Sequence, residues 1–298
     1  MAATKKITSL RAPAAPSLVA PSVVDTQLGE LLQGDGTLTE QDIQDIFAAQ
    51  MEHGEGFGEA ASRLGLVSEQ DVQRVLARQA EFPLVASGES ALSPELITAY
   101  QPHSKRAEEL RTLRSELVLR WFGRGNRVLA VVEARSGNGC NVLAANLAVT
   151  FAQLGERTLL IDANLRAPTQ HTLFGLTAKF GLVDFLEGRE SLDRVLTGVP
   201  GFSCLSVVCA GASPPNPQEL LGHISFGYLM ETSPTKYDVV IVDAPPMLEC
   251  ADGQLIAARA GGVVLATKRH RTRLADAIRV KSQLEPAGAV LLGAVIDD

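Results

Sequence analysis

The sequence of 298 residues is poor in cysteine and tyrosine and has no excess of basic residues. Its net charge of −7 argues against general binding of nucleic acid, which a basic domain or stripe would indicate. The spacings of the four cysteines do not match a zinc site, and a chain of this size does not need disulfides to fold. These cysteines, expected to be reduced thiols in a cytosol, are Cys140, Cys204, Cys209 and Cys250.

Long apolar runs are also absent. No segment approaches the roughly 18–20 apolar residues that a membrane-spanning helix needs. Arg11, Pro13 and Pro16 interrupt the stretch after Lys5 and Lys6, which argues against a signal peptide. We expect a cytoplasmic protein that is peripheral to a membrane only through a partner.

The first third of the chain changes composition twice. Residues 1–24 are rich in Ala, Pro, Ser and Thr and are expected to form a disordered tail. Residues 25–82 contain an internal repeat with an offset of 29 residues, and residues 83–102 are expected to be a linker with one short helical turn. In the repeat, Gly29, Gly36, Glu40, Gln41, Asp42, Gln44, Ala48 and Gln50 recur as Gly58, Gly65, Glu69, Gln70, Asp71, Gln73, Ala77 and Gln79.

Each copy of the repeat carries a helix start. A hydroxyl residue, Thr39 or Ser68, is followed three residues later by Asp42 or Asp71. This spacing is typical of a capping box, in which the hydroxyl accepts a free N–H and the acid favours the positive end of the helix. Apolar residues then follow at helical spacing. Residues 25–82 are therefore predicted to form a small helical domain of two mutually packed repeats.

The pattern changes again from Ser104. A helix is predicted up to about Trp121, and apolar strand candidates then alternate with helical stretches. This alternation predicts an α/β fold over residues 103–298, with a mostly parallel sheet flanked by helices. The strand candidates are 127–132, 157–161, 204–208, 238–242, 262–267 and 289–296, and the helical stretches are 141–154, 250–259 and 272–284.

A glycine-containing loop joins the first of these strands to a helix. Backbone N–H groups in such a loop, together with the helix N-terminus, form a cradle for phosphate groups. The usual ending is Gly-Lys-Ser/Thr, but here it is Gly139-Cys140-Asn141, so the lysine is missing. A bland tight turn is the alternative interpretation of the loop alone. The predicted nucleotide-binding residues are Arg135, Gly137, Asn138, Gly139, Cys140, Asn141 and, from the last strand, Asp297.

Two acids close later strands of the predicted sheet. Asp162 follows Leu159-Leu-Ile and Asp243 follows Val239-Val-Ile-Val. Because open α/β sheets place ligands at the carboxyl ends of their strands, both acids are expected to converge near the loop. There they are candidates for catalysis and, with Asn141, for holding Mg²⁺. The alternative is that they only cap strand ends.

Three segments in order carry a specific resemblance. Leu-Ile-Asp162-x-x-Leu-Arg, Asn216-Pro-x-Glu-Leu-Leu and Val-Asp243-x-Pro-Pro resemble the bacterial tyrosine kinases of capsule and exopolysaccharide synthesis, over about two thirds of the chain. Within that family, the sequence is most similar to the chain-length-determinant kinase of the EpsG type. The resemblance implies a P-loop fold that binds ATP or ADP with Mg²⁺, and a Wzz-type chain-length-determinant protein of the inner membrane as partner. It also implies a homo-oligomer, through an oligomerisation motif matched by Glu108, Arg111 and Arg114.

The departures from the family pattern cluster around the nucleotide. Cys140 replaces the lysine, Asn141 the magnesium-binding hydroxyl, Asn164 a second acid, and Asp297 an asparagine resembling an adenine contact. Loss of one strong electrostatic contact costs on the order of 3–4 kcal/mol in a transition state. Arg135 is a candidate substitute cation. The family's tyrosine-rich tail is not found before Asp298, which leaves Tyr100 as the expected phosphoacceptor rather than Tyr228 or Tyr237.

The N-terminal repeat resembles the N-terminal domain of MshE-type secretion and pilus assembly ATPases, some of which bind cyclic-di-GMP. The matching residues are Leu28, Gly29, Gln50, Phe57, Gly58 and Gln79. The stacking arginine expected before each apolar–Gly pair is replaced by Gln27 and Gly56. A plain docking module is the alternative to cyclic-di-GMP binding.

Taken together, the family resemblance implies a regulator of exopolysaccharide chain length or export, and the changed loop residues favour a pseudokinase or weak ATP binder. Two alternatives stay open: an active ATP-dependent tyrosine autokinase, and a cyclic-di-GMP-responsive effector. A chromosome-partition ATPase is disfavoured by the Asn216–Leu221 segment and by the helix carrying Glu108.

Overall fold

The computed structural model describes residues 32–33, 38–53, 56–67, 92–137 and 139–297. The chain forms two compact units, Met1–Glu81 and Phe82–Asp298. None of the described helices combines the length and the apolar character that crossing a bilayer requires.

The described part of the N-terminal unit contains helix α2 (Glu40–His53) of 14 residues and helix α3 (Phe57–Arg63) of 7 residues. The predicted capping box at the start of α2 is confirmed. The N–H of Thr39 donates to the Asp42 carboxylate at 2.7 Å, and the N–H of Asp42 donates to Thr39 Oγ1 at 3.3 Å. Ile46 and Phe57 are fully buried between the two helices. The second predicted helix start, Ser68, lies outside the described residues.

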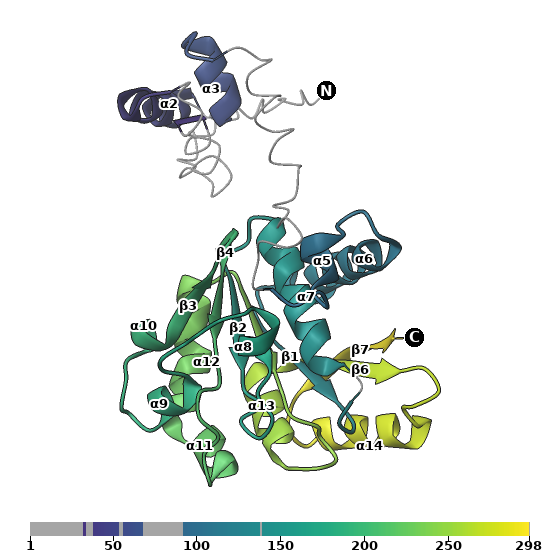
Figure 1. Cartoon of the computed structure of the whole chain (residues 1–298). Helices are drawn as coiled ribbons and strands as arrows, with labels where there is room; N and C mark the ends of the chain where they lie inside the picture. The colour runs from purple at the N-terminus through teal and green to yellow at the C-terminus, as the bar shows by residue number, and fades with distance from the viewer. Residues whose placement is uncertain (1–31, 34–37, 54–55, 68–91, 138, 298) are drawn as a thin grey trace, which may run out of the picture. The chain divides into compact units, whose positions relative to one another are not determined.

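The larger unit alternates helices and strands (Figure 1). Its first half contains α5 (Ile97–Tyr100), α6 (Lys105–Arg120), the 3-10 helix η1 (Phe122–Arg124), β1 (Val128–Glu133), α7 (Cys140–Gln153), β2 (Thr158–Asp162), α8 (Gln170–Leu173), α9 (Leu182–Leu186) and α10 (Leu192–Val195). Its second half contains β3 (Leu196–Val199), β4 (Phe202–Val208), α11 (Pro217–Gly222), α12 (Ile224–Lys236), β5 (Val239–Asp243), α13 (Asp252–Ala260), β6 (Gly262–Lys268), α14 (Leu274–Leu284) and β7 (Val290–Asp297).

The strands form one seven-stranded sheet in the order β3-β4-β2-β5-β1-β6-β7. All neighbouring strands are parallel except β3, which pairs antiparallel with β4. The predicted α/β fold with a mostly parallel sheet is therefore confirmed. Strand β3 is missing from the sequence prediction because it is short, contains Gly198 and is largely half-buried, so no apolar run marks it.

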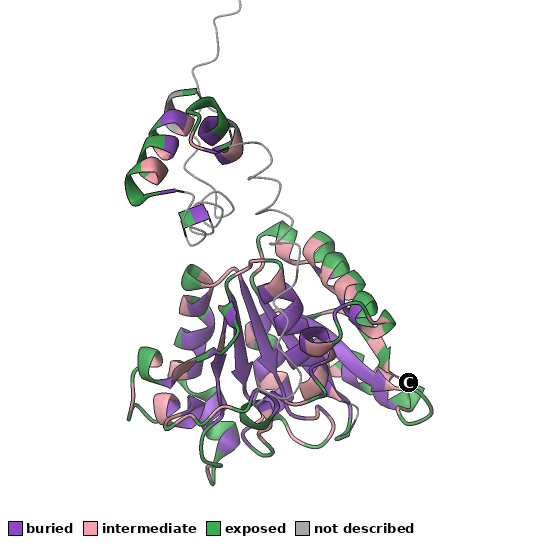
Figure 2. Cartoon of the chain, turned by 45° about the horizontal axis from the view of Figure 1, so that its top comes forward, coloured by how far each residue is buried: buried purple, intermediate pink, exposed green. Residues whose placement is uncertain are grey.

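Alternate residues of the central strands enter two separate hydrophobic cores, one on each face of the sheet. In β1, Val128, Ala130 and Val132 pack under the α9–α14 side, whereas Leu129 and Val131 pack under the α5–α8 side. The central strands β1, β2 and β5 are therefore buried throughout, and exposed residues are concentrated on the outer faces of the helices (Figure 2). A sheet buried on both faces is the expected setting of parallel strands.

The second half of the expected linker packs into this unit. Leu92, Leu96 and Ala99 belong to the core on the α7 side. The buried amide of Asn146 on α7 accepts from the N–H of Thr98 at 3.1 Å, and the Ser93 N–H donates to the carbonyl of residue 173 at 2.8 Å. The predicted single helical turn corresponds to α5. Residues 83–91 lie outside the described residues.

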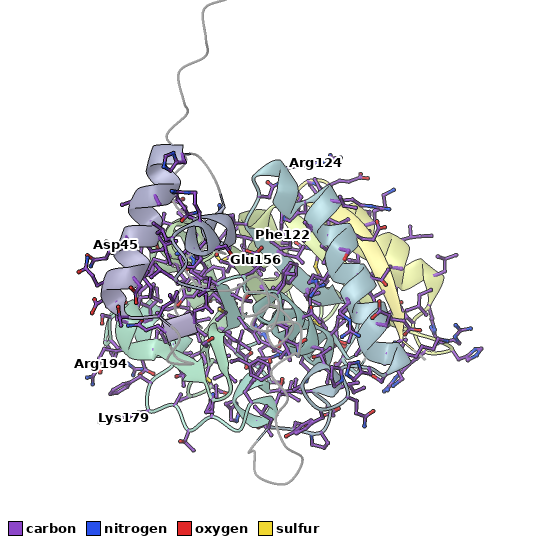
Figure 3. All side chains as sticks on the ribbon, turned by 90° about the horizontal axis from the view of Figure 1, so that it is seen from above. Asp45, Phe122, Arg124, Glu156, Lys179 and Arg194 are labelled. Atoms are coloured by element: carbon purple, nitrogen blue, oxygen red, sulfur yellow. The ribbon has the colours of Figure 1, made fainter. Side chains whose placement is uncertain are left out.

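The surface near the antiparallel edge carries a small cationic cluster. Lys179 and Arg194 lie side by side in the view from above (Figure 3), and both cations lie over the ring of Phe180, at 5.0 and 5.4 Å from its centroid. Cation–π contacts of this kind cover the half-buried ring at the periphery of the sheet.

Candidate functional site

The phosphate loop connects the carboxyl end of β1 to the N-terminus of α7. Gly137 and Gly139 have φ angles of +89° and +80°, a region that non-glycine residues rarely adopt. This backbone turns the chain sharply into α7, a helix of 14 residues whose first N–H groups have no partner within the helix. The loop thus has the backbone of an anion cradle. Asn138 lies outside the described residues.

Cys140, at the position of the usual lysine, points into the protein. Its side chain is 3% exposed, and its Sγ lies 3.2 Å from the carbonyl oxygen of Val131 and 3.5 Å from Oδ1 of Asp243. Burial, followed by the negative charge of Asp243, raises the pKa of this thiol well above its usual range. Cys140 is therefore a neutral donor to the core and brings no positive charge to the cradle.

Asp162 and Asp243 converge as predicted. They are opposite one another in the register of β2 and β5, at the carboxyl edge of the sheet. Both are buried, and burial raises the pKa of each carboxyl; the charge of Asp162 raises the pKa of Asp243 further. The pair therefore favours the protonated state at a pH where exposed aspartates are ionised.

Gln170, which the sequence did not single out, ties the two acids together. Its Nε2 donates to Oδ2 of Asp243 at 2.7 Å and to the carbonyl of Asn141 at 3.1 Å. The backbone N–H groups of Gln170 and Thr169 both donate to Oδ2 of Asp162 at 3.0 Å. The residue lies in α8, a single turn whose sequence has no helical periodicity, so no signal marked it.

The donor set does not fit a magnesium ion held by the protein. Both oxygens of Asp243 already accept hydrogen bonds, and Nδ2 of Asn141 donates to Thr169 Oγ1 at 3.0 Å. Within the described part of the chain, Oδ1 of Asp162 is buried without a partner, but no cluster of three acidic, histidine or cysteine side chains suits a metal. Magnesium requires several oxygen ligands in a near-octahedral arrangement.

Two cavities flank the loop and share Gly137 and Asn141 in their walls. One has a volume of about 410 Å³ and lies toward α6, β6 and β7. The other has a volume of about 490 Å³ and lies in front of Asp243 and the loop after β2. Asp297, the predicted adenine contact, lines the first cavity, where its carboxylate pairs with Arg106. The cradle is therefore open on both sides.

The sequence comparison places the chain among kinases. No family model matches the sequence. The tyrosine-protein kinase YwqD of Bacillus subtilis (strain 168) is 35% identical over 208 residues, which cover 70% of this chain and 87% of that protein. The chain belongs to the bacterial tyrosine-protein kinase family.

Solved structures agree with this family. The kinase domain of the Escherichia coli tyrosine kinase ETK superposes with a TM-score of 0.67 and 28% identity, over 72% of this chain and 83% of that one. The chimerical protein CapA2B2 gives a TM-score of 0.63 and 31% identity, over 77% and 98%. The septum site-determining protein MinD of Pyrococcus horikoshii, solved with Mg-ADP, is 21% identical over 57% of this chain and 70% of that one, with a TM-score of 0.50, and shows the P-loop NTPase fold alone.

Arg135, the candidate substitute cation of the phosphate loop, is paired within the protein. Its guanidinium pairs with the Asp276 carboxylate of α14 at 3.0 Å, and this pair lowers the pKa of Asp276. Glu249, which no sequence pattern marks, accepts from the N–H and the hydroxyl of Ser136 at 3.0 and 2.6 Å. A carboxylate therefore already occupies the start of the loop.

The three residues of the family's oligomerisation motif lie on α6 but point in different directions. Arg114 donates to the carbonyl of Thr150 at 2.8 Å, and Arg111 donates to the carbonyl of Pro102. Glu108 is exposed and pairs with Arg111. Both arginines therefore make hydrogen bonds within their own chain, and homo-oligomerisation stays a prediction.

Tyr100 is poorly placed as a phosphoacceptor. Its ring is half-buried, and its hydroxyl donates to the carbonyl of Leu92 at 2.7 Å. Tyr228, on the outer face of α12, is 59% exposed. The segment that carries Tyr100 packs against α7 and does not remain a free linker, and phosphorylation of Tyr100 stays a prediction.

Cyclic-di-GMP binding also stays a prediction. Leu28, Gly29 and Gln79 lie outside the described residues. Phe57 is 1% exposed and makes an edge-to-face contact with Phe47 at 5.5 Å. Gly58 and Gln50 are half-buried in the same unit.

Proposed function

We propose that this chain is a nucleotide-binding, weakly active or inactive member of the tyrosine-kinase family. The observation that carries the proposal is the orientation of Cys140: the residue that replaces the lysine donates into the core, toward the buried Asp243. The cradle itself keeps its glycine backbone and its helix N-terminus. The site thus keeps the backbone features that bind phosphate and lacks the positive charge that phosphoryl transfer needs.

The nucleotide would bind with its phosphates at the backbone of Gly137 and Gly139. The base and ribose would occupy the cavity of about 410 Å³ between α6 and β7, beside Asp297 and Arg106. That volume lies within the range typical of small-molecule sites. ATP and ADP are the expected ligands, and Mg²⁺ would arrive with the nucleotide phosphates and their waters rather than on a protein-held site.

Phosphoryl transfer is disfavoured by the same network. Transfer depends on positioning and on fixed positive charge near the transferred group. Cys140 supplies no such charge, and Asp243 accepts hydrogen bonds on both oxygens, which hinders a role as base. We therefore expect nucleotide binding to serve regulation rather than turnover.

By its family, the chain is proposed to regulate exopolysaccharide chain length or export. The partner would be a Wzz-type inner-membrane copolymerase, and the chain would be cytoplasmic and self-associating. An active tyrosine autokinase is the alternative reading of the same site. It requires Asp162 and Asp243 to leave their hydrogen bonds with Gln170 and the α8 backbone.

The decisive experiment separates binding from turnover. Calorimetry measures ATP and ADP binding, and phosphate release with Mg²⁺ measures turnover, in the wild type, in Asp162→Ala and in the double variant Cys140→Lys/Asn141→Ser. We expect the wild type to bind nucleotide with no turnover above buffer. Turnover in the wild type that Asp162→Ala abolishes would identify an active kinase, and absence of binding except in the double variant would mark a decayed site.

A further inference from the structure

The turn after β6 places a guanidinium against the phosphate loop. A Cβ built on Gly137 would lie 3.1 Å from Nη2 and 3.4 Å from Nη1 of Arg271. The guanidinium of Arg271 therefore packs on the backbone of the loop at a glycine with φ of +89°. A side chain at position 137 would displace this cation, which gives the glycine a second role besides the turn.

Arg271 differs from the other arginines around the cradle. Arg106, Arg135 and Arg166 each pair with an aspartate. The side chain of Arg271 is exposed and, within the part of the chain that the structure describes, has neither a hydrogen bond nor an ion pair. Its charge is thus available to a ligand, whereas the charges of those three arginines are already paired with aspartates.

The turn that carries Arg271 is held by its own backbone. The N–H of Lys268 donates to Thr272 Oγ1 at 2.8 Å, and the N–H groups of Arg271 and Thr272 donate back to the Lys268 carbonyl at 3.1 and 2.9 Å. The Arg269 N–H donates to the carbonyl of Asp297 on β7 at 2.7 Å. The backbone at Arg271 is therefore held in place by the turn, and its guanidinium reaches the loop at Gly137.

We propose that Arg271 supplies the positive charge to the polyphosphate of a bound nucleotide, in place of the lysine that Cys140 has replaced. This inference rests on the nucleotide binding proposed above. A guanidinium presents a planar fork of donors that matches phosphate oxygens. Because it approaches from the β6 turn rather than from α7, Arg271 confers affinity for the phosphates without restoring the lysine's position on the helix.

The test uses calorimetry of the whole chain with ATP, ADP, AMP and adenosine. Arg271→Gln, which removes the charge and keeps most of the side-chain packing, should weaken ATP and ADP binding by about ten- to a hundredfold. Adenosine binding should be unchanged. Arg273→Ala is the matched control, because Arg273 is an exposed arginine two residues further along that is not placed on the loop.

Two further variants test whether Arg271 takes over the role of the lysine that is missing at position 140. Cys140→Lys in the Arg271→Gln background should recover at least part of the lost ATP affinity, and Arg271→Lys should retain more affinity than Arg271→Gln. Thermal melting of each variant confirms that the fold is intact. Higher salt should weaken ATP binding in the wild type more than in Arg271→Gln, because an exposed ion pair is screened.

The outcomes separate the two proposals. Wild-type binding of ATP with unchanged affinity in Arg271→Gln overturns the role of Arg271 and leaves the proposed function intact. An equal loss of ATP affinity in Arg273→Ala would show that only the overall positive charge of the turn matters. That result would also overturn the role of Arg271. Lys268 lies in the wall of the first cavity. A loss of ATP affinity in Lys268→Ala and not in Arg271→Gln would identify Lys268 as the cation that binds the phosphates, and would overturn the role of Arg271. No binding of any nucleotide by the wild type overturns both proposals.

Discussion

Sγ of Cys140 lies 3.5 Å from Oδ1 of Asp243. A helix start that in this family presents a cation to the nucleotide therefore presents a neutral thiol to a buried acid. The same acid accepts from Gln170 on its other oxygen. These hydrogen bonds fill the protein side of the phosphate loop, whereas the loop backbone borders the two cavities.

Replacing Asp243 by asparagine should stabilise the protein at neutral pH. The folded-state pKa of this carboxyl is raised by burial and by Asp162, so the folded state binds more protons than the unfolded state above the ordinary carboxyl pKa. Stability must therefore fall as the pH rises through that range, and the loss is complete above the raised pKa. Asp243→Asn removes part of this cost, about 1–3 kcal/mol at pH 7.

Urea unfolding of the wild type and of Asp243→Asn from pH 4 to pH 9 measures this effect. The variant should show a flatter pH profile, with the largest gain at the alkaline end. Asp238→Asn is the control with opposite sign, because the Arg157 guanidinium donates hydrogen bonds to the Asp238 carboxylate and thereby lowers its pKa. A steeper profile in Asp243→Asn would contradict the prediction.

Gln170→Ala should destabilise the protein by about 2–4 kcal/mol. The change leaves Oδ2 of Asp243 and the carbonyl of Asn141 without the side-chain donor that they share in the core. Gln254→Ala on α13, at a half-buried position, should cost less than about 1 kcal/mol. Chemical denaturation of the two variants gives the comparison, and equal losses would show that the buried bridge is energetically unimportant.

Nucleotide affinity should depend only weakly on magnesium. The described residues offer no complete ligand set, and Asn141 donates to Thr169 where a magnesium-binding hydroxyl is expected. ADP titrations with Mg²⁺ and with excess EDTA should therefore agree within about threefold, a difference of less than 1 kcal/mol. In the Cys140→Lys/Asn141→Ser variant, the hydroxyl should make binding tighter with Mg²⁺. A strong magnesium requirement in the wild type would refute the assignment.

Glu108 and Arg114 should respond differently to truncation. Arg114→Ala removes a donor to the Thr150 carbonyl and should lower stability by about 1–2 kcal/mol. Glu108→Ala changes an exposed ion pair and should alter stability by less than about 0.5 kcal/mol. If the motif contributes to self-association, Glu108→Ala should lower the mass measured by light scattering without a change in the melting temperature. An unchanged mass would remove Glu108 from the subunit contact.

The strands and the positions of the acids were predictable from the sequence because they depend on local pattern. Continuous apolar runs predicted β1, β2, β5 and β6, and strand ends placed Asp162 and Asp243 at one edge. The edge strand β3 and the short helices α8 to α10 have too few residues to show a period. Gln170 was missed for this reason, although it bonds to Asp243 and Asn141.

The sequence and the structure draw attention to different arginines near the phosphate loop. Arg135 belongs to the loop in sequence, yet it pairs with Asp276 on α14. Arg271 is far from the loop in sequence, and its only local signal is the basic run from Lys268 to Arg273. The parallel pairing of β1 with β6 brings the two loops together, and long-range strand order cannot be derived from local composition.

The sequence by itself determined the α/β fold, the phosphate loop without its lysine and the presence of two acids near it, because each depends on residues adjacent in the chain. Only the tertiary structure decided which groups meet: Cys140 turns toward Asp243, Gln170 bridges the acids, and Arg271 lies on Gly137. The physical reason is burial. The direction of a side chain at a loop or strand end follows from which partners the packed sheet and helices leave for it.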